Sequence, residues 1–337
     1  MALTSTTMDF QLTLAHILER AGGVAGEQEI VTRRADGDLH RYTYTDFYRR
    51  TRALSAGHLE AGLERGDRVG SLMWNSYGHL EAYYGVPTAG GVLHTINARM
   101  HPDDIAYVIQ HAGVRFVIVD DVLLDLWRRS RQLVSVERTF VFPLNGGALQ
   151  DILQAGEEDY EALLAGAPVP SPYPELRETE PATLCYTGGT TGRPKGVVYS
   201  HRALIRHAFA ECTVDGFGYG RADVALPVVP MFHVNGWGIP FSAVMAGAKL
   251  VLPGPRVDPD SLASLCEGEQ VTFAAGVPTV WADFLRRLDD GPTVRLAQKF
   301  EILTGGSAPH ESLVRGFDRH GIPLLQGWGL TESSGVL

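Results

Sequence analysis

Two kinds of hydrophobic pattern alternate along this chain. Short apolar runs bounded by polar or glycine residues predict buried strands at residues 68–73 and 114–119. Apolar residues spaced three or four positions apart predict amphipathic helices between such runs. The longest of these helices is predicted over residues 46–61, with Thr45 as its N-cap residue. Its apolar stripe consists of Phe47, Leu54, Ala56 and Leu59.

The same alternation continues to the end of the chain and favours an α/β fold. Further helices are predicted from Asn75-Ser76 through Tyr84, over residues 103–110 after Pro102, and over residues 122–129. In the second half, strands are predicted at residues 225–229, 249–252, 272–275 and 301–304.

Residues 156–180 are predicted to form a connection, because four prolines punctuate the second part of this stretch. We place a subdomain boundary near Glu180. It divides the chain into a first α/β subdomain over residues 1–180 and a second over residues 181–337. The sequence contains no internal repeat and no low-complexity segment.

The segment 186–196, which reads Tyr-Thr-Gly-Gly-Thr-Thr-Gly-Arg-Pro-Lys-Gly, carries the strongest chemical signal. Glycines allow a backbone to turn sharply and approach a ligand, and hydroxyl and N–H groups can surround an anion. Lys195 adds a mobile positive charge suited to a phosphate. These residue types together predict a loop that binds polyphosphate. The alternative is a plain surface turn rich in glycine and threonine.

This loop is not a Walker A motif, since no glycine-lysine pair stands at the required spacing from Gly188 or Gly189. Residues 183–186 are predicted to enter the loop as a strand, and residues 197–199 to leave it as another. A helix follows only after Ser200, its predicted N-cap residue. The loop is therefore predicted to join two strands.

The loop resembles the phosphate loop of the adenylate-forming enzymes, which include acyl-CoA synthetases, aryl-CoA ligases, luciferases and amino-acid adenylation domains. Four later segments resemble motifs of the same family and occur in the family's order. They are residues 230–237 (Pro-Met-Phe-His-Val-Asn-Gly-Trp), 276–279 (Gly-Val-Pro-Thr), 304–309 (Thr-Gly-Gly-Ser-Ala-Pro) and 326–332 (Gln-Gly-Trp-Gly-Leu-Thr-Glu). The sequence is most similar to bacterial medium- and long-chain fatty-acyl-CoA synthetases.

The resemblance implies the layered α/β N-terminal domain of this family, with two β-sheets flanked by helices. It implies a reaction that uses ATP, Mg²⁺ and coenzyme A. Thr187 and Glu332 would hold Mg²⁺ and the phosphates, and Thr331 would lie near the α-phosphate. The rest of the phosphate loop would wrap the β- and γ-phosphates through Gly188, Gly189, Thr190, Thr191, Gly192 and Lys195. For Glu332, the alternative is an ordinary acidic residue at a helix start.

The remaining predicted contacts concern adenine and the acyl group. Trp328 would lie against the adenine, where the family more often has tyrosine; the alternative is a core tryptophan. Gly305, Gly306, Ser307 and Ala308 would line the adenine through their backbone, and the alternative for them is an ordinary turn at a strand end. Gln326, Gly327 and Gly329 would also belong to the nucleotide site. His233 would meet the acyl carboxylate or shield the reacting centre, Val234 would line an acyl tunnel, and Trp237 would gate it; core packing is the alternative for His233 and Trp237. His201 and His207 are predicted to lie on a helix surface.

The residues around His233 bear on the acid that is activated. Amino-acid adenylation domains usually place an aspartate in this segment to pair with the substrate amine, and none is present. Val234, Gly236 and Ile239 suggest an apolar wall instead. A fatty acid is therefore favoured, and an aryl acid stays open because a wall of small apolar residues also suits a ring.

Composition limits the partners. The net charge of −10 and the pI near 5.6 argue against nucleic acid. The three cysteines, Cys185, Cys212 and Cys266, show no metal or redox spacing, which suits a reducing cytoplasm. No secretory signal and no membrane-spanning apolar run is visible. Relatives of the most similar branch form homodimers, so a homodimer is expected.

The sequence therefore predicts a fatty-acid–CoA ligase. An aryl-acid or other carboxylic-acid ligase is one alternative. The chain stops at Leu337, five residues after Glu332. The ribose-binding aspartate, the hinge and the C-terminal domain with its catalytic lysine are absent from it. We expect a truncated N-terminal domain that does not turn over by itself. The other alternative is a non-catalytic nucleotide- or acyl-binding module that ends at Leu337.

Overall fold

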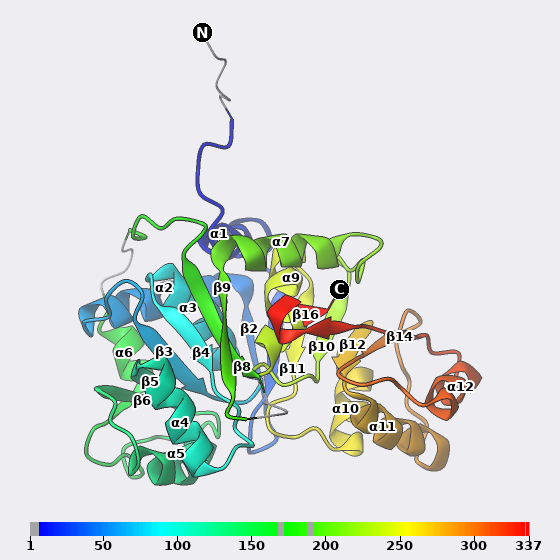
Figure 1. Cartoon of the computed structure of the whole chain (residues 1–337). Coiled ribbons are helices and arrows are strands. Elements are labelled where there is room, and N and C mark those ends of the chain that lie inside the picture. Colours follow the sequence, from blue (N-terminus) through cyan, green and yellow to red (C-terminus); the bar gives the residue numbers. More distant parts are fainter. Residues whose placement is uncertain (1–6, 168–171, 188–191, 334, 337) are drawn as a thin grey trace.

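The computed structural model describes residues 7–167, 172–187, 192–333 and 335–336, and two mixed β-sheets dominate it (Figure 1). This architecture confirms the predicted α/β fold with two sheets flanked by helices. Strands and helices alternate along both halves of the chain, so most neighbouring strands are parallel and their apolar runs are buried between helices.

The first sheet has seven strands in the order β7-β6-β5-β3-β4-β8-β9, and only β9 is antiparallel to its neighbour. In that order the strands are Glu157–Asp159, Arg138–Phe142, Val114–Asp120, Arg68–Leu72, Val92–Thr95, Pro181–Thr187 and Lys195–Ser200. The β8–β9 pair confirms that the predicted phosphate loop joins two strands.

The second sheet also has seven strands, in the order β14-β13-β12-β10-β11-β1-β2, and β2 is its antiparallel member. In that order the strands are Leu324–Gln326, Glu301–Thr304, Phe273–Gly276, Val224–Pro227, Lys249–Leu252, Glu29–Arg33 and Leu39–Thr43. A short ribbon of β15 (Gly329–Leu330) and β16 (Gly335–Val336) follows. Each sheet takes strands from both sides of Glu180, so the boundary near Glu180 does not separate the sheets. The division into subdomains stays a prediction.

Helices cover the sheets in separate groups (Figure 1). α4 (Pro102–Ala112) and α5 (Leu124–Arg131) pack on the first sheet, and α10 (Pro259–Glu269), α11 (Pro278–Asp290) and α12 (Glu311–Arg319) pack on the second. The other helical segments are α1 (Ala15–Val24), α2 (Tyr44–Glu60), α3 (Tyr77–Thr88), η1 (Asp121–Leu123), α6 (Tyr160–Ala165), α7 (His201–Cys212), α8 (Val234–Trp237), α9 (Ile239–Ala246) and η2 (Thr331–Ser333).

Capping residues place several helix starts. Ser76 accepts a hydrogen bond from the backbone of His79, and Ser200 accepts one from Ala203, as predicted. The predicted cap at Thr45 is wrong: Thr43 is the N-cap of α2 and forms a capping box with Asp46. Thr45 lies inside the first turn of that helix, which therefore starts two residues earlier than its polar pattern suggested.

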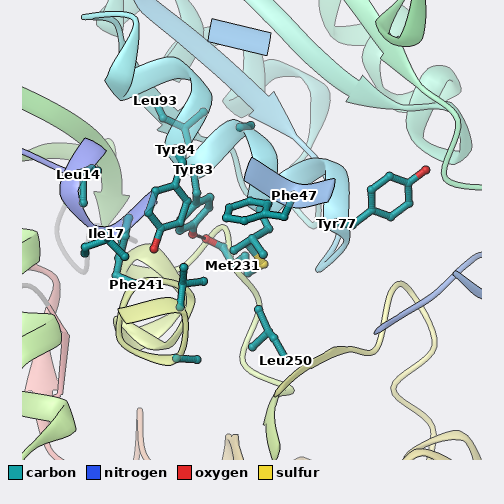
Figure 2. Close-up of a cluster of buried hydrophobic side chains, with 14 of the residues drawn as sticks. Leu14, Ile17, Phe47, Tyr77, Tyr83, Tyr84, Leu93, Met231, Phe241 and Leu250 are labelled. Carbon is teal, nitrogen blue, oxygen red and sulfur yellow. Dashed lines mark hydrogen bonds between the residues drawn. The ribbon is translucent and has the colours of Figure 1, made fainter. Parts of the chain in front are cut away.

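The fully buried helix α3 lies at the centre of the main core. Figure 2 shows Tyr83 and Tyr84 of α3 with Phe47 of α2, Met231 and Phe241 in one cluster. Tyr83 donates a hydrogen bond to the carbonyl of Met231, and Tyr84 donates one of 3.0 Å to the carbonyl of Pro240. The two phenols thus bind both ends of the segment that carries the predicted acyl-side residues.

Three predictions fail for reasons of tertiary packing. The predicted connection over residues 156–180 contains β7 and α6. His201 and His207 are buried, because the N-terminal segment near Leu14 and helix α9 cover the parts of α7 that were predicted to face solvent. The ring of His201 accepts a 3.2 Å hydrogen bond from the backbone of Leu14. Sequence spacing identifies a helix face, and distant chain segments decide what covers it.

No helix in the described part of the chain is both long and apolar enough to span a membrane. Cys185, Cys212 and Cys266 are all free thiols, and burial raises the pKa of Cys185 and Cys212 to about 11. No pair of them forms a disulfide in this structure. The predicted cytoplasmic location stays a prediction.

Buried histidines predict acid sensitivity. Burial lowers the pKa of His58 and His201 to about 4, and of His79 and His94 to about 3. Below the ordinary pKa near 6.5 the unfolded chain binds protons that the native chain excludes. Stability should therefore fall as pH decreases from about 6.5 toward 4, by about 1.4 kcal/mol per pH unit for each such histidine.

The variant His58→Gln should reduce this slope by the contribution of one histidine. Its matched control is His16→Gln, which changes an exposed ring. Urea unfolding of both variants at about pH 7.5, 6 and 5 gives the slopes. Equal slopes for wild type and His58→Gln would contradict the prediction.

Candidate functional site

Loops from several parallel strands of the second sheet meet at its carboxyl edge. The ends of β12, β13 and β14 are in register, so Gly276, Thr304 and Gln326 lie side by side. The N–H of Gly327 donates a 2.8 Å hydrogen bond to the carbonyl of Thr304. Val277 lies against Gly306. In open α/β sheets, ligands bind in the crevice outside the carboxyl ends of the strands. The structure thus unites three of the predicted motif segments.

The side chain of Trp237 packs against this edge of the second sheet. A Cβ atom on Gly305 would lie 3.0 Å from Cη2 of Trp237 and 3.1 Å from the carbonyl oxygen of Gly327. The indole is buried within the main core cluster. Gly305 is therefore required by close approach, and Gly306 by its φ of +79°. The predicted gate residue and the predicted adenine-side loop are in contact.

The other predicted adenine-side residues are more open. Trp328 is 62% exposed, so it is not the core tryptophan of the alternative interpretation. Ser307, Ala308 and Gln326 are exposed, and Gly329 is half-buried at the start of β15. The edge consequently presents a flat aromatic face next to exposed backbone, which suits stacking of a planar ring.

The β8–β9 hairpin brings the ends of the predicted phosphate loop together. Thr187 and Lys195 are cross-strand partners, and Gly192 and Lys195 are exposed. Gly188, Gly189, Thr190 and Thr191 lie outside the described residues. The hairpin therefore places a hydroxyl and an ammonium group at the base of the loop.

Helix α4 contacts both sides of this hairpin, which no pattern in the sequence predicted. The hydroxyl of Tyr186 and Nδ1 of His111 are hydrogen-bonded at 2.7 Å. The guanidinium of Arg193 lies 4.8 Å from the centroid of the Tyr107 ring, a cation–π distance. His111 and Tyr107 stand one helical turn apart, so a single helix face supports the hairpin before and after the loop.

The predicted magnesium residue lies next to the same hairpin. Thr331 and Glu332 form the short helical turn η2, and Tyr199 of β9 donates a hydrogen bond to the carbonyl of Thr331. Burial, with a smaller contribution from the Glu332 carboxylate, raises the pKa of Tyr199. Glu332 is exposed and close enough to that phenol to affect its ionisation. The η2 turn therefore connects the motif at residues 326–332, which follows β14 of the second sheet, to the β8–β9 hairpin of the first sheet.

The donor chemistry of this region suits a hard cation. Glu332 offers a carboxylate and Thr187 a hydroxyl, and Mg²⁺ in nucleotide sites binds one or two such protein oxygens together with phosphates and water. The described residues contain no group of three or more His, Cys, Asp and Glu side chains that could hold a metal alone.

His233 begins a rare left-handed turn. The φ angles of Val234, Asn235, Gly236 and Trp237 are 42°, 49°, 63° and 56°, and that of Gly238 is 78°. This conformation is unfavourable for a β-branched residue such as Val234 and persists only where the surroundings impose it. The imidazole of His233 is half-buried, and burial, followed by the charge of Arg99, lowers its pKa.

Asn235 ties this turn to the first sheet. Its amide nitrogen donates a 2.8 Å hydrogen bond to Oγ1 of Thr183, and its amide oxygen accepts one of 3.3 Å from the Cys185 thiol. Both partners lie on β8, directly before the phosphate loop. One buried asparagine therefore couples the left-handed turn to β8, the strand that leads into the predicted phosphate loop.

A cavity of about 120 Å³ lies between the end of β4, α4, the base of the hairpin and Phe232-His233. Its polar lining includes His94, Thr187 and His233. Within the described structure, neither ring nitrogen of His94 has a hydrogen-bond partner, and burial keeps this imidazole neutral. The cavity joins two predicted site residues, Thr187 and His233, to a histidine that no sequence pattern singled out.

Residues 18–337 match the family described as AMP-binding enzyme. The chain belongs to this family. It is 44% identical over 339 residues to the long-chain-fatty-acid–CoA ligase of Thermus thermophilus, covering 100% of this chain and 60% of that protein. It is 38% identical over 325 residues to the medium-chain-fatty-acid–CoA ligase of Ectopseudomonas oleovorans, covering 96% of this chain and 59% of that protein. The chain therefore spans about 60% of the length of these curated relatives.

Solved structures of AMP-binding enzymes share the fold. The anthranilate CoA ligase AuaEII in complex with anthranoyl-AMP aligns with a TM-score of 0.85 at 20% identity, over 99% of this chain and 63% of that one. The N-terminal domain of FACL13 from Mycobacterium tuberculosis aligns with a TM-score of 0.79 at 25% identity, over 96% of this chain and 77% of that one. The predicted fold and family are thereby confirmed.

The contact between Trp237 and Gly305 predicts a specific steric effect. In Gly305→Ala the new methyl group meets the indole and the Gly327 carbonyl, so we expect a loss of about 1–3 kcal/mol in the free energy of unfolding. The control is Gly268→Ala in α10, where nothing lies within 4 Å and stability should stay or rise. Urea unfolding measures both, and equal stability of the two variants would contradict the predicted contact.

Proposed function

We propose that the protein to which this chain belongs is a fatty-acid–CoA ligase. It would activate a fatty acid with ATP and transfer the acyl group to coenzyme A. The observation that carries the proposal is the contact of the apolar Trp237 turn with the Gly305 loop at the carboxyl edge of the second sheet. Two of its relatives act on long- and medium-chain fatty acids by name, and their similarity extends over almost all of this chain.

The chemistry consists of two substitutions. A carboxylate oxygen of the acid attacks the α-phosphorus of ATP, and pyrophosphate leaves. The thiolate sulfur of coenzyme A then attacks the acyl carbon, and AMP leaves with the electron pair of the broken C–O bond. Both partners of the first step are anions, so orientation and charge compensation supply most of the acceleration.

The hairpin would bind the phosphates. Lys195 and Thr187 face each other at its base, and the loop residues between them would supply backbone N–H groups and hydroxyls. Mg²⁺, held by Glu332 and Thr187 together with the phosphates, would add positive charge at the reacting phosphorus. Arg193 lies over Tyr107, which would keep a second cation near the loop.

The adenine and acyl groups would lie on either side of Trp237. Trp328 and the Gly305–Ala308 loop would contact the adenine, and Thr331 would lie by the α-phosphate. His233 would meet the acyl carboxylate as a neutral donor, consistent with its lowered pKa. Val234 and Trp237 would line the acyl pocket. The segment contains no aspartate or glutamate to pair with an amine, which argues against an amino-acid substrate.

An aryl acid is the second candidate. One curated relative is a benzoate–CoA ligase of Arabidopsis thaliana, 31% identical over 311 residues that make up 88% of this chain and 52% of that protein. Homodimer formation and a cytoplasmic location belong to the same proposal. The expected inactivity of residues 1–337 alone also belongs to it, and a non-catalytic binding module is the other alternative.

The deciding experiment is a substrate panel with the natural full-length protein. Octanoate, decanoate, palmitate, benzoate and alanine are each incubated with ATP, Mg²⁺ and coenzyme A, while pyrophosphate release and thioester formation are followed. We expect both products with the aliphatic acids. Preference for benzoate would select the aryl ligase, and ATP binding without pyrophosphate release from any acid would select the binding module. The same assay on residues 1–337 tests the expected inactivity of the shorter chain.

Lys195 should contribute to the first substitution. In Lys195→Ala a phosphate-side cation is lost, and we expect pyrophosphate exchange to slow by about 10²–10³-fold. The control is Arg129→Ala, which removes an exposed cation from α5. Exchange at the wild-type rate in Lys195→Ala would remove this lysine from the proposed mechanism.

A further inference from the structure

A buried polar cluster lies between α7 and α9, behind the predicted site. Its members are His207, Glu211, Tyr219 and Ser242, and all four side chains are buried. Ser242 donates a hydrogen bond to the Glu211 carboxylate and is also hydrogen-bonded to the phenol of Tyr219. Nε2 of His207 lies 2.8 Å from Oε1 of Glu211. Burying a carboxylate is costly unless such partners compensate it, so its presence here requires a reason.

The side chains of this cluster pack closely against the backbone of Gly238. A Cβ atom on Gly238 would lie 2.5 Å from Oε1 of Glu211 and 2.5 Å from Cδ2 of His207. Oγ of Ser242 also lies 3.3 Å from the Gly238 carbonyl oxygen, as a second and weaker hydrogen bond. Gly238 therefore cannot move toward α7, because the side chains of Glu211 and His207 occupy the space beside it.

Gly238 is the last residue of the left-handed turn. The turn's first half is held to β8 by Asn235, through the hydrogen bonds of its side chain. In its second half, Trp237 has a φ of 56°, which is unfavourable for a residue with a Cβ atom, whereas Gly238 adopts its positive φ without strain. The cluster supplies the missing constraint at this end, since the side chains of Glu211 and His207 lie directly behind Gly238.

The position of Gly238 determines where the preceding side chain lies. The Trp237 indole contacts the Gly305 loop, with Cη2 lying 3.0 Å from the Cβ position of that glycine. A displaced Gly238 backbone would thus move the indole relative to the adenine-side loop. A hydrogen-bonded network suits this task because each member restricts the others.

We propose that Glu211, together with His207 and Ser242, is a positioning residue that sets the place of the Trp237 indole and thereby the acyl chains that the site accepts. The acyl-selectivity part rests on the proposed function. Glu211 acts through the Gly238 backbone and takes no part in the chemical steps.

The first test compares Glu211→Ala with Glu211→Gln in the natural full-length protein. Alanine empties the space behind Gly238, so the ratio of kcat/KM for decanoate to that for palmitate should change by about 10-fold, with the KM for ATP unchanged. Glutamine keeps the volume and an acceptor oxygen for Ser242, and should retain the wild-type ratio. The control is Glu269→Ala, which removes another buried carboxylate, paired with Arg41 and Lys249. It should lower stability without changing the ratio.

The second test does not require activity. Tryptophan is replaced biosynthetically by fluorotryptophan, and the fluorine NMR signal of Trp237 is assigned from its loss in Trp237→Phe. In Glu211→Ala this signal should shift, while the signal of the distant Trp127 should not. Should Glu211→Ala fail to fold, Gly238→Ala adds a methyl group that meets Glu211 and His207, pushes the same backbone away from α7, and should shift the same signal.

The outcomes separate the two proposals. An unchanged Trp237 signal in a folded Glu211→Ala variant overturns the positioning role, and so does an equal rise in KM for ATP and for the fatty acid. A wild-type protein that forms no acyl-CoA overturns the proposed function alone, because the fluorine signal still reports where the indole lies.

Discussion

The side-chain amide of Asn75 joins the two sheets of this protein. Asn75 follows β3 in the first sheet. Its amide nitrogen donates hydrogen bonds of 2.8 Å to the carbonyls of Pro227, the last residue of β10 in the second sheet, and of Val229, two residues further on. Its amide oxygen accepts one of 2.8 Å from the backbone of Met231. A loop buried between sheets must satisfy its backbone groups, and this residue satisfies three of them.

The segment that carries the predicted acyl-site residues begins at Met231, whose backbone N–H binds Asn75. Tyr83 binds the Met231 carbonyl, Tyr84 binds that of Pro240, and Asn235 binds β8, so the segment is held to helix α3 and to the first sheet. Such a dense set of partners explains how a turn with a β-branched residue at positive φ can persist. Unfavourable backbone geometry of this kind is found where binding sites need a side chain in one fixed place.

The candidate site is accordingly an assembly of two sheets. The second sheet contributes the Gly305 loop and Trp328 from its parallel strands, and the first contributes Thr187 and Lys195 from its only antiparallel pair. The η2 turn connects them, because Tyr199 of the hairpin binds the carbonyl of Thr331. A change in how the sheets pack would therefore separate the β8–β9 hairpin from the Gly305 loop and Trp328.

The sequence by itself determined the alternation of strands and helices of an α/β fold, the two strands joined by the phosphate loop, and the five motif segments that identify the family. These are local properties: apolar periodicity, the Ser76 and Ser200 caps, and residue types at fixed spacing. It did not determine that His201 and His207 are buried, that α4 supports the hairpin through His111 and Tyr107, or that Glu211 lies behind Gly238. Those contacts join residues from distant parts of the chain or depend on which helix face a neighbour covers. Only the packing of both sheets around α3 decides them, because burial depends on neighbours that no local pattern encodes.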